Sequence, residues 1–323
     1  MDIRAPRRTT IALAAAGALA STGTAYVGAR NLLIGQAQQA RSVIPKAWAI
    51  PPRADGVYTR GGGPAQRWQR GVPVDLHLMV FGDSTATGYG CRSADEVPGV
   101  LLARGLAEQT GKRIRLSTKA IVGATSKGLS GQVDAMFVAG PPPDAAVIMI
   151  GANDITALNG IGPSASRLGA AVRRLRSSEA VVVVATCPDF GLVTAIPQPL
   201  RWVAHTRGLR LARAQAIAVR AAGGVAVPLA DLLTPQFRHS PQRLLSDDQY
   251  HPSADGYALV AGQLLPALCN ALGETDAALA LDRPVPTQAA ERRPGRLRFS
   301  ITRLLRRGPT TGVPAPVIVS ASG

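Results

Sequence analysis

The chain has few aromatic residues and few of the residues that bind metal ions. Phe, Trp and Tyr make up 4% of its 323 residues, too few to predict a surface on which sugars or nucleic-acid bases stack. It has four histidines and three cysteines, and it has no Walker loop, dinucleotide fingerprint or zinc-binding helix. We therefore expect no nucleic-acid partner, no cofactor and no metal centre.

Cys91, Cys187 and Cys269 form an odd set. In an exported protein one disulfide plus one buried thiol is an option, and spacing alone leaves the pairing open. Cys91 follows closely after the motif Gly82-Asp83-Ser84. At this position a disulfide bridge or a structural thiol is favoured over a catalytic thiol.

The excess of positive charge lies mainly outside the central part of the chain. The formal net charge is +16, but residues 74–272 carry eighteen Lys and Arg against fourteen acidic residues. A nucleic-acid enzyme is expected to carry its basic stripe on the folded body. Basic flanks favour contact with an anionic membrane surface instead.

Residues 1–30 predict a signal peptide or a membrane anchor. Three arginines in the first eight residues precede an uncharged run from Thr9 to Ala29, which as a helix would be roughly 31 Å long, the thickness of a hydrocarbon core. A small-x-small pattern typical of a cleavage site ends at Ala20, before Ser21. A cleaved signal and a retained anchor both remain open. In either case we expect an exported protein, membrane-anchored or secreted into the cell envelope.

Residues 31–73 predict a stalk or linker without a core of its own. Pro45, Pro51, Pro52 and a run of three glycines before Pro64 interrupt any regular element there.

Residues 273–323 predict a basic, largely disordered C-terminal tail. Seven arginines lie between Glu291 and Arg307, together with four apolar residues in helical spacing: Leu297, Ile301, Leu304 and Leu305. A basic amphipathic helix of this kind favours peripheral binding to anionic lipid, and a solvated tail is the alternative.

Residues 74–272 predict one α/β domain. Short β-branched runs at 76–81, 114–121, 145–150, 180–186 and 225–229 alternate with helical patterns near 97–110, 129–139, 164–176, 202–222 and 253–272. The run Val181 to Val184 is continuously apolar, as in a strand that helices cover on both faces. Strand and helix in alternation predict a doubly wound, parallel sheet.

Three polar motifs fall where such a sheet places a site. Gly82-Asp83-Ser84 follows the first predicted strand, Gly151-Ala152-Asn153-Asp154 follows the third, and Asp248-Gln249-Tyr250-His251 comes later. Residues after the carboxyl ends of the strands line the crevice in which open α/β sheets bind ligands. Together the motifs supply a hydroxyl nucleophile, an amide donor, an acid and a base for acyl transfer.

The motifs assign chemical roles. A serine hydroxyl needs an imidazole to take its proton, and a carboxylate to orient that imidazole. We predict that Ser84 is the nucleophile, His251 the base and Asp248 the orienting acid. Asp247 is the competing carboxylate, but the three-residue spacing favours Asp248.

The body resembles the SGNH hydrolases, also called GDSL-type esterases and lipases, over about residues 74–272. The resemblance implies a flavodoxin-like α/β/α three-layer sandwich with a mostly parallel sheet. It also implies Ser84, Asp248 and His251 as catalytic residues, and an oxyanion hole formed by Ser84, Gly123 and Asn153.

We therefore predict an exported serine ester hydrolase that forms an acyl-enzyme on Ser84. The expected substrate is a small-molecule, lipid or acylated-glycan ester. An acyltransferase that uses the same acyl-enzyme and a catalytically silent envelope-binding protein are the alternatives. The complete polar set favours an enzyme, because a silent fold has no physical need to retain nucleophile, amide donor, acid and base together.

Overall fold

A six-stranded sheet forms the centre of the protein in a computed structural model, which describes residues 27–29, 31–39 and 50–274. The strand order is β1-β3-β2-β4-β5-β6. The strands are β1 (Gly56–Tyr58), β2 (Leu76–Gly82), β3 (Ile114–Thr118), β4 (Ala145–Met149), β5 (Val181–Ala185) and β6 (Val225–Val227). All neighbouring pairs are parallel except β1 with β3. This confirms the predicted mostly parallel α/β fold.

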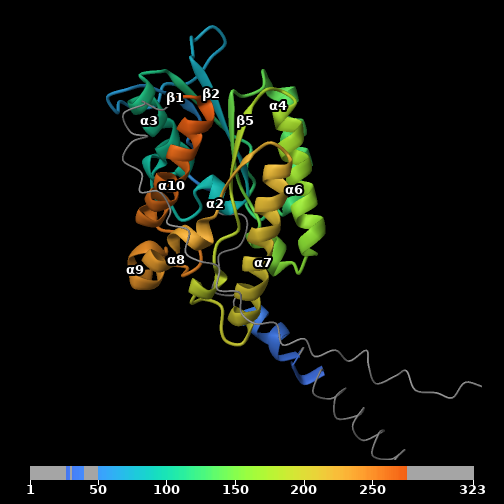
Figure 1. Cartoon of the computed structure of the whole chain (residues 1–323). Coiled ribbons are helices and arrows are strands. Elements are labelled where there is room, and N and C mark those ends of the chain that lie inside the picture. The colour runs from blue at the N-terminus through green and yellow to red at the C-terminus, as the bar shows by residue number, and fades with distance from the viewer. Residues whose placement is uncertain (1–26, 30, 40–49, 275–323) are drawn as a thin grey trace, which may run out of the picture. The chain divides into compact units, whose positions relative to one another are not determined.

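Helices cover both faces of the sheet (Figure 1). The longer ones are α3 (Pro98–Thr110), α4 (Leu129–Ala139), α6 (Ile161–Arg176), α7 (Leu200–Ala221), α8 (Leu229–His239) and α10 (Ala254–Leu272). Shorter ones are α2 (Ser84–Thr87), α5 (Ala152–Thr156), α9 (Pro241–Leu244) and the 3-10 turns η1 (Ala94–Glu96), η2 (Ser126–Gly128) and η3 (Phe190–Leu192).

Alternation along the strands divides the core into two layers. Successive side chains of a strand point to opposite faces, so Val147 of β4 packs with α3, α8 and α10. Its neighbour Ile148 packs with α4, α6 and α7. Both residues are fully buried, which explains why the central strands are continuously apolar.

The predicted stalk does not extend through β1. Gly56–Tyr58 pairs antiparallel with β3, and Val57 and Tyr58 are buried. The physical reason is that the outer edge of β3 would otherwise present unpaired backbone groups, and an added strand satisfies them. A strand of three residues is too short for its alternation to stand out among the prolines and glycines around it.

The predicted N-terminal signal or anchor and the C-terminal tail fall almost entirely outside the described residues. Where the chain is described, no helix is long and apolar enough to cross a membrane. The three cysteines are free thiols. Burial raises the pKa of the Cys91 thiol to about 12, which makes it a poor nucleophile at neutral pH.

Candidate active site

Ser84 stands at the first turn of α2, directly after β2. Gly82, two residues earlier, has φ +134°, and a Cβ there would lie 1.9 Å from the carbonyl oxygen of Met149, so only glycine fits this close crossing. Asp83 then caps the helix, because its Oδ1 accepts a hydrogen bond of 3.0 Å from the N–H of Thr85. The strand, the tight glycine and the cap together fix the position of the Ser84 hydroxyl.

His251 reaches this hydroxyl from the loop between α9 and α10. Its Nε2 lies 2.9 Å from Ser84 Oγ, and its Nδ1 lies 2.6 Å from Asp248 Oδ2. The three side chains are nearly closed to solvent, with Ser84 and His251 5% exposed and Asp248 9%. The predicted nucleophile, base and orienting acid thus form one chain of hydrogen bonds.

Asp248 is held by its own loop. Its Oδ1 accepts hydrogen bonds from the Ser246 hydroxyl at 2.7 Å and from the N–H groups of Tyr250 and His251 at 2.9 Å. Burial alone would raise the pKa of Asp248, but the hydrogen bonds and the charge of His251 lower it to about 2. The carboxyl group is therefore ionised at neutral pH, as the predicted orienting role requires.

Asp247, the competing carboxylate, faces away from the site. Its side chain is 98% exposed and lies 3.5 Å from the guanidinium of Arg92. The His251 ring is instead flanked by Tyr89, with ring centroids 4.5 Å apart, and by Tyr250, edge-on at 4.8 Å. Packing and the Asp248 hydrogen bond thus fix the orientation of the imidazole.

Gly123 and Asn153 lie on neighbouring segments at the same edge of the sheet. Gly123 follows β3 and has φ +81°, a conformation that favours glycine. Asn153 lies in α5, and its Nδ2 donates a hydrogen bond of 3.0 Å to the carbonyl of Ala124. An amide nitrogen carries two hydrogens, so one N–H of Asn153 is left for a ligand. The N–H of Ser84 has no intrahelical acceptor either, because it is in the first turn of α2.

Asp154 of α5 holds the segment after Gly123 by hydrogen bonds, a role that the motifs did not predict. Its buried carboxylate accepts hydrogen bonds from the N–H and hydroxyl of Ser126 at 2.8 and 2.7 Å, from the hydroxyl of Ser164 at 2.8 Å and from the amide of Asn159 at 2.9 Å. Ser126 begins η2, just after Gly123. The sequence signal for this role was the position of Asp154 directly after Asn153. The sequence did not show which residues on other segments Asp154 contacts.

Two buried glutamines also fix the ends of the central strands. Gln132 of α4 bonds both the N–H and the carbonyl of Gly82 at 2.8 Å. Gln215 of α7 accepts from the N–H of Cys187 at 2.7 Å and donates to the carbonyl of Ile150 at 2.9 Å. Both amides position backbone beside the site, and neither belongs to a recognisable motif.

A second histidine–aspartate pair lies nearby. His205 of α7 contacts the carboxylate of Asp189 through Nδ1. Asp189 also accepts hydrogen bonds from the N–H of Gly191 at 2.7 Å and the hydroxyl of Thr234 at 3.4 Å. It thus connects η3 with α7 and α8. In the described part of the chain, no group of three or more His, Cys, Asp or Glu residues is arranged to hold a metal ion.

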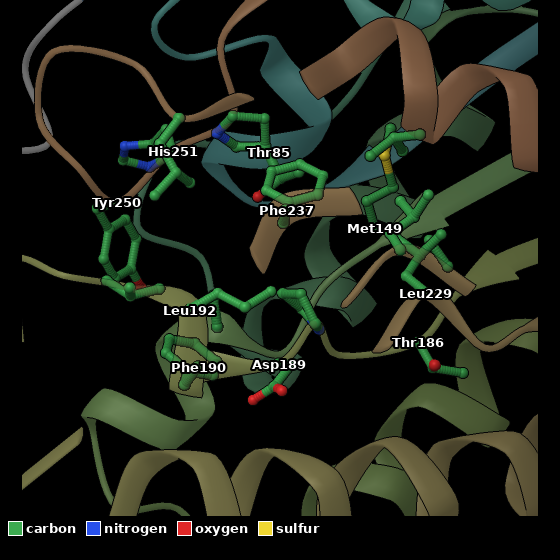
Figure 2. A pocket seen from close by; sticks show the side chains of 18 of the residues that line it. Thr85, Met149, Thr186, Asp189, Phe190, Leu192, Leu229, Phe237, Tyr250 and His251 are labelled. Atoms are coloured by element: carbon green, nitrogen blue, oxygen red, sulfur yellow. The ribbon is translucent and has the colours of Figure 1, made fainter. Parts of the chain in front are cut away.

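A largely apolar pocket adjoins His251 (Figure 2). Residues from the ends of β4 and β5, from η3, from α8 and from the His251 loop line it. They include Met149, Thr186, Phe190, Leu229, Phe237 and Tyr250. Asp83 also lines the pocket, and its burial raises its pKa to about 6 despite the opposing hydrogen bond from Thr85.

Comparisons with known proteins identify the family of this chain. The model of the GDSL-like Lipase/Acylhydrolase family matches residues 80–259. The chain is 70% identical over 310 residues to the GDSL-like esterase Rv1075c of Mycobacterium tuberculosis (strain ATCC 25618 / H37Rv), an alignment that covers 96% of this chain and 99% of that protein.

Two solved structures are similar to this chain, and the first of them supports the fold. The lipase/acylhydrolase from Enterococcus faecalis has a TM-score of 0.50 and 22% identity, and the match covers 62% of this chain and all of that one. LAE5, an alpha/beta hydrolase from the metagenome of Lake Arreo, Spain, has a TM-score of 0.49 and 20% identity, covering 63% and 98%. Together with the family model and the 70% identical esterase, the motifs lead to one conclusion. The chain belongs to the GDSL-like lipase/acylhydrolase family and is a serine hydrolase of carboxylic esters.

Proposed function

We propose that this esterase works through an acyl-enzyme on Ser84, with His251 as the base and Asp248 as the orienting acid. The observation that carries the proposal is the continuous hydrogen-bonded chain from Ser84 Oγ to His251 Nε2, and from His251 Nδ1 to Asp248. It is buried and made by side chains from two distant segments, so it does not arise from a local turn.

In the first step Ser84 Oγ attacks the ester carbonyl carbon and its proton passes to His251 Nε2. The carbonyl oxygen becomes an oxyanion, for which the N–H groups of Ser84 and Gly123 and the free N–H of Asn153 are the donors. Asp248 stabilises the imidazolium. When the carbon–oxygen bond to the alcohol breaks, His251 returns the proton to the leaving alcohol.

In the second step His251 removes a proton from a water molecule, which attacks the acyl carbon. The bond to Ser84 breaks, Ser84 regains a proton from His251, and the carboxylic acid leaves. An alcohol in place of water would give acyl transfer by the same steps. We propose hydrolysis of a lipid, acylated-glycan or other small ester as the main reaction.

The Ser84→Ala variant tests the nucleophile. We expect it to keep the fold, to lose turnover of an ester panel of increasing chain length, and to lose labelling by a serine-directed phosphonate. Running the panel with and without an added alcohol separates hydrolysis from transfer. Labelling of another residue in Ser84→Ala would contradict the assignment, and a wild-type chain inactive on every ester would favour the silent binding protein.

We further propose that the enzyme is exported and held at the cell envelope. The support comes from the two ends of the sequence. At the N-terminus three arginines precede an uncharged run, and Glu291–Gly323 is rich in arginine. Two weak membrane signals on one chain bind more firmly than either alone. With the N-terminal arginines inside, both the catalytic body and the tail lie outside, where the tail meets outward-facing anionic lipid or acidic envelope polymers.

Fractionation and vesicle binding test this location. We expect the protein in the membrane or envelope fraction, and weaker, salt-sensitive binding to anionic vesicles when residues 291–323 are deleted from the signal-free form. Equal binding of the two forms at low salt would contradict the role of the tail. Recovery of a soluble chain that starts at Ser21 would show a cleaved signal in place of an anchor.

A further inference from the structure

One face of α7 is exposed and carries positive charge without an acidic neighbour on its own helix. α7 contains five arginines and no Asp or Glu. α6, which packs beside it (Figure 1), contains four arginines and again no Asp or Glu. Three arginines of α7 are exposed and make no ion pair or hydrogen bond with any residue that the structure describes: Arg210, Arg213 and Arg220.

Other exposed arginines of the body have a carboxylate beside them. Arg174 of α6 lies 2.7 Å from Asp134 of α4, and Arg243 lies 2.6 Å from Asp255. Surface pairs of this kind contribute little to stability, but they neutralise the surface on which they lie. The exposed arginines of α7 keep their charge, so this face suits an anionic partner outside the chain.

Two large apolar side chains share the exposed face of α7. Trp202, in the first turn, is 63% exposed, and Ile217 is 69% exposed. Ile217 lies between Arg213 and Arg220 at helical spacing, and Trp202 lies about three turns before Arg213, so they point to one side. From Trp202 to Arg220 this side of the helix is about 27 Å long. We call it the α7 stripe, which consists of Trp202, Arg210, Arg213, Ile217 and Arg220.

A bilayer with anionic headgroups accepts both kinds of side chain in the α7 stripe. Guanidinium groups bind phosphate oxygens by paired, charge-assisted hydrogen bonds. Tryptophan is enriched at the boundary between membrane and water, where its ring is partly in the apolar layer and its N–H meets the headgroups. A hydrated acidic polymer would bind the arginines but leave Trp202 and Ile217 in water. The mixture of residues therefore favours a lipid surface.

The end of the predicted N-terminal anchor lies near the start of the same helix. The uncharged run ends at Ala29, and residues 31–39 form a helix. From this helix Gln36 donates a hydrogen bond to the carbonyl of Gln198 and accepts one of 3.0 Å from the N–H of Leu200. Leu200 is the first residue of α7. A run embedded in the membrane would therefore bring the first turn of α7 to the bilayer surface.

We propose that the α7 stripe docks on the outer, anionic surface of the membrane and holds the folded body against it. The inference goes beyond the proposed function, because it involves neither the catalytic residues nor residues 291–323. Each arginine near an anionic leaflet strengthens the attraction by about fivefold. Three arginines together therefore shift the docking equilibrium by about 100-fold, and salt screens this attraction.

Tryptophan fluorescence of the full-length chain reconstituted in vesicles tests docking at both ends of the stripe. The vesicles contain phosphatidylglycerol, or phosphatidylcholine alone as the neutral control, and bromine on the acyl chains quenches nearby indoles. The difference between wild type and Trp202→Phe reports one end, and Ile217→Trp in the Trp202→Phe background reports the other. We expect quenching at both positions in anionic vesicles. It should be lost in neutral vesicles and at about 1 M salt, where the Debye length is about 3 Å.

Charge reversal with a matched control identifies the arginines. The control lies in the segments around β1, at the opposite edge of the sheet from β6, which α7 contacts. The test variant combines Arg210→Glu, Arg213→Glu and Arg220→Glu. The control variant changes three exposed arginines that have no ion pair with a described residue: Arg53→Glu, Arg67→Glu and Arg70→Glu. The test variant should shift docking by about 100-fold or more and remove the quenching, whereas the control should keep it within about twofold.

Turnover of a soluble ester without vesicles should stay within about twofold of wild type in both variants, which shows that they fold. Equal quenching in neutral and anionic vesicles would overturn the proposal, and so would an equal loss in the two variants. Binding of wild type to polyglutamate that depends on the three arginines, without quenching by lipid, would overturn it and assign the stripe to an acidic polymer. The comparison of lipids and salts uses wild type, so it decides the question even if a variant does not fold.

Discussion

Two histidine–aspartate pairs lie near the carboxyl edge of the sheet, and their surroundings differ. His251 and Asp248 come from one loop, are nearly fully buried, and face the hydroxyl of Ser84. His205 and Asp189 are sixteen residues apart, and the His205 side chain is 34% exposed. Within the part of the chain that the structure describes, Nε2 of His205 has no hydrogen-bond partner.

The contrast shows what a histidine–aspartate pair needs in order to act as a general base. The carboxylate orients the imidazole in both cases, but a base also needs a hydroxyl at its other nitrogen. The Asp189 carboxylate instead accepts hydrogen bonds from residues of η3, α7 and α8 and so connects these three elements. In Figure 2 its oxygens point away from the labelled side chains of the His251 loop. In the proposed mechanism the same two residue types thus act as a catalytic pair at His251 and Asp248, and as structural support at His205 and Asp189.

Removing each imidazole gives the largest expected difference. His251→Ala should lower kcat/KM by about 10⁴-fold or more, because Ser84 loses its base. His205→Ala should change it by less than about tenfold, since no hydroxyl depends on that ring. Steady-state kinetics on one soluble ester measures both. Comparable losses in the two variants would mean that His205 also takes part in the reaction.

We expect a similar difference between two amide side chains near Asp154, one proposed to act in catalysis and one structural. Asn153→Ala should lower kcat by on the order of 10²–10³ with little change in KM, because it removes a donor to the oxyanion. Asn159→Ala is the matched control. Its Nδ2 donates to Asp154 Oδ1 at 2.9 Å, so we expect a small effect on kcat. If Asn153→Ala raised KM alone, the residue would bind substrate in the ground state and not the oxyanion.

Asp248 should make stability depend on pH. Its pKa in the folded protein is lowered from 3.8 to about 2, so its contribution is present above about pH 4 and is lost as pH falls toward 2. The contribution is about 2 kcal/mol. Urea unfolding at several pH values should show a stability difference between wild type and Asp248→Asn that shrinks by this amount as pH falls. A difference independent of pH would show that Asp248 is not ionised in the fold.

Asp189→Asn should have the smallest effect. Charge-assisted hydrogen bonds become neutral ones, so we expect a loss of about 1 kcal/mol in the free energy of unfolding and less than a tenfold change in kcat/KM. Thermal unfolding and kinetics on the same preparation measure the two. A loss of kcat/KM as large as that expected for His251→Ala, without a loss of stability, would remove the distinction between the pairs.

The motif residues could be predicted because local rules govern them. Gly82-Asp83-Ser84 is a glycine, a helix cap and the proposed nucleophile in consecutive positions at the end of an apolar strand. Asp248 and His251 are three residues apart, and the backbone of one loop brings them together. The choice of Asp248 over Asp247 followed from the same short spacing.

The contacts between distant segments had no local signal. Asp154 holds Ser126 from 28 residues away, and Gln132 holds Gly82 from 50 residues away. In the sequence each of these amides or carboxylates looks like an ordinary residue of a helix or loop. Its role becomes visible only when folding places the partner segment beside it. β1 was missed for a related reason, because its pairing with β3 outweighs the prolines and glycines that surround it.

The sequence by itself determined the alternation of strands and helices, the order of the motifs and the chemical types at the site, because each depends on neighbours a few residues apart. Only the tertiary structure decided that His251 meets Ser84 across 167 residues, and that Asp83 and Thr186 share one pocket. These contacts depend on which strands are adjacent and in what register. Packing of the whole domain sets that order, since burial of both sheet faces is satisfied only when all the helices are in place.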